Sequence, residues 1–201
     1  MEAQVGRKRP TKLRAVAAGT ALSSIFVQSA PASANWSGVT GVEDNCSGQN
    51  NQADNELHTF AYVNVQSSMS QQLVNLRSQI DAAETVVSTL SVPLTDTTDA
   101  VVYDENYTTY CGFQWDGPVE ETWGITQCKF LNGANACDRH ETRFDTDNYL
   151  AGPTFRLHVA CHEIGHSFGL LHRNDKCMTN TAAPTVTQYS AHDKAHWNNE
   201  L

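Results

Sequence analysis

Hydrophobic and polar positions alternate in several short stretches of the first three quarters of the chain. The stretch from His58 to Val65 (HTFAYVNV) is rich in aromatic and β-branched residues, which is typical of a β-strand. Ala100–Asp104 is a shorter segment of the same kind, and Thr122–Phe130 and Arg139–Asp145 are two further candidates. The pattern therefore predicts at least four strands.

Two longer segments have the spacing of amphipathic helices. The first runs from about Ser68 to Leu90, and we expect it to end before Pro93. Its apolar positions recur at steps of three and four residues: Leu73, Leu76, Ile80, Ala83 and Val87. A shorter helix is predicted at the C-terminus, where Ser190 is followed three residues later by Asp193 in the arrangement of a capping box.

The second long helix is expected to begin at Pro153 and to run to about Ser167, because proline suits the first helical position and Gly169 can end the helix. At about 100° per residue, one narrow stripe of this helix is apolar and should face the core. Its members are Leu157, Ala160, Cys161, Ile164 and Phe168. The side chains of His158, His162 and His166 lie on another face, toward a cleft or solvent.

The order of these elements predicts an α/β (α+β) fold with a mixed sheet. Residues 1–34 are predicted to be a secretory signal peptide, with a basic start, an apolar stretch and the small residues Ala32-Ser33-Ala34 before the cleavage point. The alternative for this segment is a basic tail. The remaining residues, 35–201, suit a single domain.

Charge narrows the range of partners. Without residues 1–34 the chain loses five of its 13 Lys and Arg residues and one of its 22 Asp and Glu residues, so its net charge is −13. Such a surface repels phosphate backbones and anionic lipid. We therefore expect a secreted, extracellular monomer that binds neither nucleic acid nor a membrane.

Histidine spacing predicts a metal site. His162 and His166 lie one turn apart on a helix, so both imidazoles can reach one ion. Gly169 lets the chain turn, and His172 follows as a third ligand. Glu163 points off the histidine face and can take a proton from a water beside the metal. Three histidines leave a zinc ion one open position, as hydrolysis requires.

Six cysteines permit 15 disulfide pairings, and their even number after a signal peptide suggests that disulfides form. We expect Cys128 to pair with Cys137 across a short loop and Cys161 with Cys177 across the proposed site. These two pairs leave Cys46 with Cys111. Zinc ligation by cysteines is the competing interpretation, but no pair has the C-x-x-C spacing.

The segment 162–172 (HEIGHSFGLLH) matches the pattern H-E-x-x-H-x-x-G-x-x-H and resembles the metzincin clan of zinc metalloendopeptidases. The resemblance implies zinc at His162, His166 and His172, Glu163 as general base, and Met178 in a methionine turn beneath the metal. It also implies a twisted mixed sheet with a backing helix and an active-site helix in residues 35–172, and a small C-terminal subdomain in residues 173–201 that ends in a helix.

In that family an extended peptide substrate pairs with an edge strand beside the cleft, and Arg139–Asp145 looks like its counterpart. The resemblance is close only from Leu157 to Asn180. Arg173 and Asn180 depart from the better-known branches, so the subfamily is left unassigned.

Other interpretations remain beside the leading one, a secreted zinc endopeptidase. An aminopeptidase with the same ligands, or a catalytically silent binding protein, would share most of the pattern. His158 is a weak candidate for a fourth ligand, and His192 and His196 are taken for surface residues of the closing helix. Calcium at Asp145 and Asp147 has little support, because acidic pairs are common in so acidic a chain.

Overall fold

The structure is a computed structural model of the 201-residue chain. It describes residues 52–81, 87–90, 93–110, 113–116, 122–132, 136–145, 147, 152–174, 176–179 and 186–201. All of the described residues belong to one compact unit. The predicted signal peptide, Cys46, Cys111 and Asn180 lie outside the described residues.

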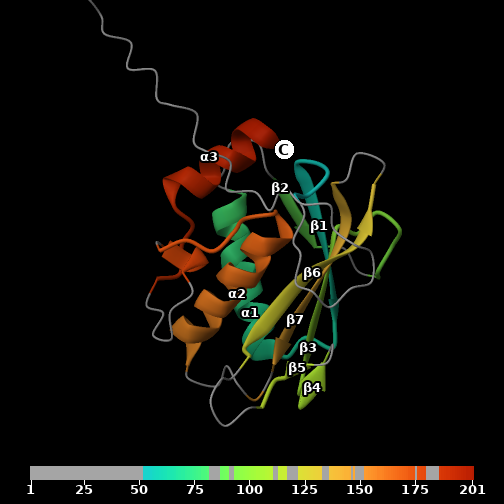
Figure 1. Cartoon of the computed structure of the whole chain (residues 1–201), viewed down its shortest axis with the longest axis vertical. Coiled ribbons are helices and arrows are strands. Elements are labelled where there is room, and N and C mark those ends of the chain that lie inside the picture. The colour runs from blue at the N-terminus through green and yellow to red at the C-terminus, as the bar shows by residue number, and fades with distance from the viewer. Residues whose placement is uncertain are drawn as a thin grey trace, which may run out of the picture. The chain divides into compact units, whose positions relative to one another are not determined.

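Five strands form one sheet in the order β2-β1-β3-β7-β6, and two short strands, β4 and β5, pair beside it (Figure 1). The strands β2, β1, β3 and β7 run parallel to one another, whereas β6 is antiparallel to β7. The sheet is therefore mixed, as the sequence predicts. The strand bounds are Leu57–Val63 (β1), Val87–Leu90 (β2), Ala100–Glu105 (β3), Thr109–Tyr110 (β4), Phe113–Gln114 (β5), Gly124–Leu131 (β6) and Cys137–Asp145 (β7).

The first helix, α1 (Ser67–Ile80), is shorter than the sequence pattern predicts. The extension to Leu90 is wrong, because Val87–Leu90 forms β2 and pairs in parallel with β1. Val87 fits the helical spacing, but the segment Val-Ser-Thr-Leu also suits a strand, and pairing with an open edge of β1 decides its conformation. The result is a β-α-β unit, in which α1 carries the chain between two parallel strands.

The prediction that Arg139–Asp145 is an edge strand is also wrong. These residues lie in β7, which has β3 on one side and β6 on the other. A hairpin connects β6 to β7 and places β6 outermost, with β7 as its one sheet neighbour among the described strands. The edge that runs beside the second helix is therefore β6.

The main core lies between the sheet and two helices, α1 and α2 (Pro153–Ser167), which lie side by side on one face of the sheet (Figure 1). Helix α1 contributes apolar residues spaced three or four apart, which lie on one face of an amphipathic helix. The strands contribute every second residue, whose side chains point to the face covered by the helices. The largest buried contributors are Phe60, Met69, Leu73, Leu76, Ile80, Phe144, Ile164, Phe168, Leu170 and Trp197.

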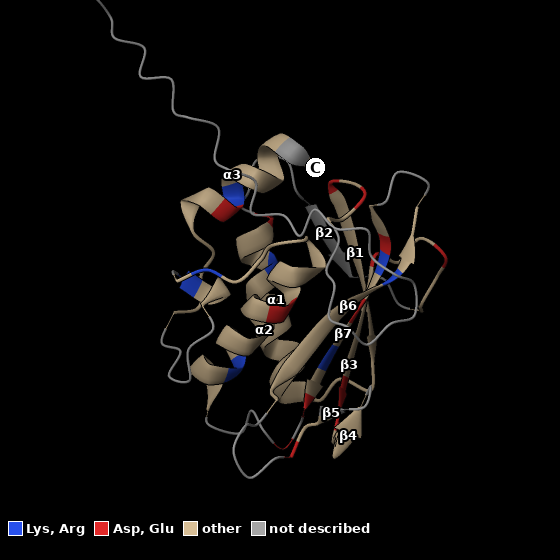
Figure 2. Ribbon diagram, in the orientation of Figure 1, with Lys and Arg blue, Asp and Glu red and all other residues tan. Residues whose placement is uncertain are grey.

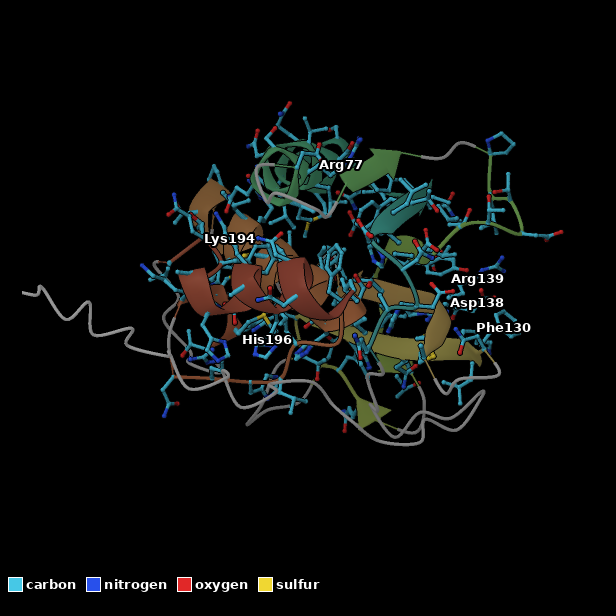
Figure 3. The ribbon with its side chains drawn as sticks, turned by 90° about the horizontal axis from the view of Figure 1, so that it is seen from above. Arg77, Phe130, Asp138, Arg139, Lys194 and His196 are labelled. Carbon is cyan, nitrogen blue, oxygen red and sulfur yellow. A yellow bond between two sulfur atoms is a disulfide. The ribbon has the colours of Figure 1, made fainter. Side chains whose placement is uncertain are left out.

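The C-terminal part contains a short 3₁₀ helix, η1 (Lys176–Met178), and the helix α3 (Ala191–Glu200). Ser190 and Asp193 form the capping box that the sequence predicts. In Figure 3, Lys194 and His196 project from opposite sides of α3. His196 is buried, so its prediction as a surface residue is wrong, whereas His192 is partly exposed.

Basic residues do not gather on one element. Figure 2 shows Lys and Arg positions scattered over helices, strands and connections, and no described helix or strand holds more than the two that β7 carries. Arg139 of β7 lies over the ring of Phe130 on β6, at the far end of the sheet in Figure 3. Among the described helices, none is long and apolar enough to cross a membrane.

Candidate metal centre

Helix α2 carries two of the three predicted metal ligands, and the turn that ends it brings in the third. Gly169 has φ +92°, a conformation that favours glycine. Its N–H donates to the carbonyl of His166, and the N–H of Leu170 donates to the carbonyl of Gly165. These two bonds form a Schellman motif, which reverses the chain directly after the helix. His172 therefore returns toward the face that holds His162 and His166.

The Nε2 atoms of the three histidines converge. His162 Nε2 lies 3.0 Å from His172 Nε2 and 3.2 Å from His166 Nε2, and the three ligand atoms lie within 4.8 Å of one another. His166 is buried, His162 is half-buried, and His172 is exposed. The structure thus brings together the three residues that the sequence singles out, at a point that solvent can reach.

Backbone carbonyls orient two of the rings. His162 Nδ1–H donates to the carbonyl of Cys177 at 2.9 Å, and His166 Nδ1–H donates to the carbonyl of Leu170 at 2.6 Å. With the proton held on Nδ1, each Nε2 presents a lone pair. Two lone pairs that face each other at 3.2 Å repel unless a proton or a cation lies between them.

The same rings are kept neutral by burial. Burial lowers the pKa of His162 to about 4, and it lowers the pKa of His166 well below its ordinary value. Partial burial lowers the pKa of His172 as well. Neutral imidazole is the form that binds a metal, so the site is ready to bind a cation at neutral pH.

These donors fit zinc. Two nitrogens at 2.0–2.1 Å from a tetrahedral zinc lie about 3.3 Å apart, close to the two Nε2 separations of the site. The oriented Nδ1–H groups supply the outer hydrogen bonds that metal-bound histidines usually make. His162, His166 and His172 would therefore hold the ion with three neutral nitrogens and leave one position open.

Glu163 lies between α2 and β6, on the side of the helix next to the metal-binding face. Its side chain is buried, and the burial raises the pKa of the carboxyl to about 8, against a smaller lowering by the hydroxyl of Thr126. A divalent cation held nearby would lower this pKa again. At a pKa of about 8 the carboxyl is mostly protonated at pH 7, so a bound cation would be needed to bring it to the carboxylate form that a general base requires.

Two residues of β6 contact Glu163, and the sequence analysis missed both. Thr126 Oγ1 lies 3.0 Å from Glu163 Oε2 and 2.8 Å from the carbonyl of Glu163. A Cβ atom at Gly124 would lie 2.6 Å from Glu163 Cγ. The signal available in the sequence was a polar threonine, two residues after a glycine, on the inward face of a predicted strand.

Met178 packs against α2 below the histidines. It is fully buried, and a Cβ atom at Gly165 would collide with its Sδ. The disulfide between Cys161 and Cys177 ties η1 to α2 at the same level, and the other pair in the described residues is Cys128 with Cys137. These are two of the three expected pairs, and Met178, the residue predicted for the methionine turn, follows Cys177 directly in the sequence.

The remaining candidates lie elsewhere. His158 Nδ1–H donates to the carbonyl of Val186 at 2.7 Å, and this residue is not grouped with the three converging histidines. Within the described residues the second group with metal-binding atom types is Cys128, Cys137 and His140, but its two sulfurs are bonded to each other. Neither group contains Asp145 or Asp147, the two calcium candidates.

Comparisons with known proteins add little to this geometry. No family model matches the chain, and no curated protein matches its sequence. Among solved structures, the chain has a likeness to the structure of myroilysin, with 11% sequence identity and a TM-score of 0.38. The match covers 62% of this chain and 52% of that one, so this chain spans about half the length of its structural neighbour.

Proposed function

We propose that the chain is a zinc-dependent, metzincin-like endopeptidase. One observation carries the proposal: three neutral imidazoles converge through their Nε2 atoms, and the helix that carries two of them also carries the buried Glu163. The spacing H-E-x-x-H-x-x-G-x-x-H and the buried methionine below the helix agree with it.

The chemistry follows from the residues. Zinc, when bound by three neutral histidines, lowers the pKa of a water toward about 7 and polarises a peptide carbonyl. Glu163 takes the proton of the attacking water and later gives a proton to the departing amine. Met178 supports the histidine-bearing helix from below, as a packed thioether and not as a ligand.

The substrate is proposed to be an extended peptide that adds to the outer edge of β6. In this role β6 replaces Arg139–Asp145, the edge strand expected from the sequence, because those residues belong to β7 and β7 lies inside the sheet. Strand addition satisfies the backbone of both partners and selects peptides over small esters or amides. The hydrogen bond between Glu163 and Thr126 of β6 supports this proposal, because a peptide paired with β6 would lie near the proposed general base.

Secretion is part of the same proposal. The predicted signal peptide and the two disulfides in the described residues support an oxidising, extracellular location. A monomer is proposed because the three converging histidines and Glu163 all come from one chain.

The test uses chain 35–201, refolded with disulfides formed, and a library of peptides blocked at both ends. Cleavage inside blocked peptides distinguishes an endopeptidase from an aminopeptidase, which needs a free amine. We expect one zinc per chain by elemental analysis, loss of cleavage with a chelator, and recovery when zinc is restored. Glu163→Gln protein, purified in the same way, controls for contaminating proteases.

Two results would count against the proposal. Cleavage that survives in the Glu163→Gln preparation comes from a contaminant or from another mechanism. Stoichiometric zinc binding without cleavage of any blocked peptide would favour the silent binding protein.

A further inference from the structure

We propose that β6 positions Glu163 through two residues: Gly124 makes room for the side chain, and the hydroxyl of Thr126 holds its carboxylate. The inference deepens the proposed function and rests on Glu163 as the general base. Both are positioning residues, since the Thr126 side chain and the space left at Gly124 act on Glu163 and not on substrate or metal.

The absence of a side chain at Gly124 leaves the space that Glu163 occupies. A Cβ atom at position 124 would lie 2.6 Å from Glu163 Cγ and 3.0 Å from Glu163 Cδ. Side-chain carbons do not approach that closely, so any residue larger than glycine would push Glu163 away from the strand. The carbonyl of Arg143, 3.1 Å from the same point, closes the other side. Gly124 therefore fixes how deeply the glutamate packs against the sheet.

The hydroxyl of Thr126 forms a hydrogen bond with the same side chain. Thr126 is buried and lies two residues after Gly124, so both face α2. Its hydroxyl has one proton, with Glu163 Oε2 at 3.0 Å and the Glu163 carbonyl at 2.8 Å as acceptors. Within the described residues, Thr126 provides the hydrogen bond that the carboxylate makes. This contact holds Oε2 against β6.

A second threonine completes the arrangement. Thr142 on β7 is fully buried, is paired in register with Thr126, and places its Oγ1 3.0 Å from Thr126 Oγ1. When Glu163 is ionised, Thr142 donates to Thr126, which donates to Oε2. Thr126 can keep this contact while the other carboxylate oxygen takes the proton of the water, so no heavier atom has to move.

The experiment compares Thr126→Val with Thr126→Ser in zinc-loaded protein. Valine keeps the shape and removes the hydroxyl, so we expect kcat to fall by about 10²-fold, with KM within about twofold and one zinc per chain. Serine keeps the hydroxyl, so kcat should stay within about threefold of the wild type. Thr98→Val is the matched control, because Thr98 is an equally buried threonine whose hydroxyl contacts Thr95 instead.

A second test does not depend on catalytic activity and measures the unfolding of zinc-stripped protein in urea. Thr126→Val, Glu163→Met and the double variant form a cycle in which methionine keeps the length of Glu163 without its oxygens. If the two side chains are coupled, the double variant shifts the unfolding midpoint by clearly less or clearly more than the sum of the single shifts. Thr98→Val with Glu163→Met should be additive.

The two failures are distinguishable. If the wild type cleaves no peptide, the proposed function fails, and the unfolding cycle alone decides whether Thr126 positions Glu163. If the wild type is active but Thr126→Val retains full kcat, or if the cycle is additive, the positioning role is overturned. If kcat and zinc content fall together, the hydroxyl supports the metal site and not the base, which also overturns it.

Discussion

At the residue scale, the three histidines differ in what holds them. His162 and His166 are each tied to a backbone carbonyl through Nδ1 and are shielded from solvent, whereas His172 is exposed on the segment that follows the Schellman turn. The two helical histidines therefore contribute to the packed structure as well as to the site. His172, in the proposed function, contributes mainly as a metal ligand.

This difference gives the first prediction. His172→Ala should weaken zinc binding by more than the 10- to 100-fold typical of losing an outer-sphere partner. The unfolding of the zinc-stripped protein should hardly change, because an exposed side chain is removed. His166→Ala should weaken zinc binding and also destabilise the zinc-stripped protein, since it leaves a cavity in the interior. Zinc competition titrations and urea unfolding measure the two effects, and equal destabilisation by both substitutions would contradict the distinction.

The second prediction concerns Glu163. Glu163→Gln should retain one zinc per chain and lose about 10²- to 10⁴-fold in kcat, the usual contribution of a general base. Glutamine keeps an oxygen for the hydroxyl of Thr126, so the folded structure should persist. Elemental analysis and kcat on one blocked peptide are sufficient, and a variant that loses its zinc would show that Glu163 has a structural role instead.

At the scale of elements, the end of α2 determines where the third ligand lies. Gly169 has φ +92°, and the carbonyl of Leu170 in the same turn accepts the Nδ1–H of His166. A change of conformation at one glycine therefore reaches two of the three ligands. The turn acts as part of the metal centre although it supplies no ligand.

Substitution of Gly169 tests this link. Gly169→Ala should destabilise the protein by about 1–2 kcal/mol, because a Cβ atom disfavours positive φ. It should also weaken zinc binding, since His166 and His172 are displaced together. Gly169→Asn is the control, and we expect a smaller loss because asparagine tolerates positive φ better. Urea unfolding and zinc titration of both variants check the order, which would be wrong if alanine were the milder change.

Much of the fold could be predicted because each main element has a local periodicity. The burial of Ala160, Cys161 and Ile164 follows from the spacing in α2, and Phe144 follows from alternation in β7. The division between α1 and β2 was not accessible, because Val87 satisfies the helical period and suits a strand equally well. Strand pairing, which is a non-local contact, resolves this ambiguity.

The candidate site shows the same limit. His162, Glu163 and His166 lie within one turn and a half of one helix, so sequence spacing places them directly. The contact between Thr126 and Glu163 spans 37 residues and depends on which strand forms the edge of the sheet. Because the edge was assigned to Arg139–Asp145, the threonine that reaches the glutamate could not be identified from the sequence.

At the scale of the whole molecule, neutral histidines buried in the core make stability depend on pH. His58 is buried, stacks on Phe168 at 4.0 Å, and lies with its Nε2 3.0 Å from the hydroxyl of Ser167. Burial, with a smaller effect from His140, lowers the pKa of His58 well below 6.5. Above pH 6.5 the His58 ring is neutral in both the folded and the unfolded protein. Below pH 6.5 the ring takes up a proton in the unfolded protein alone.

The free energy of unfolding should therefore decrease as the pH falls below 6.5, and His58 should account for up to about 1.4 kcal/mol per pH unit. His58→Phe keeps a ring against Phe168 and cannot be protonated, so the variant should lose less stability between pH 7.5 and 5.5. Urea unfolding of zinc-stripped protein at the two pH values measures the difference. Equal losses in variant and wild type would show that other groups dominate acid sensitivity.

The disulfide between Cys161 and Cys177 has a consequence for survival among proteases. All three converging histidines and Glu163 lie between these two cysteines in the sequence, inside a covalently closed ring. The segment around Leu171 and Asn174 is exposed and is a natural place for a protease to cut. A cut there leaves both fragments joined through sulfur, so nicked molecules keep their ligands tethered and are inactivated more slowly than an open chain.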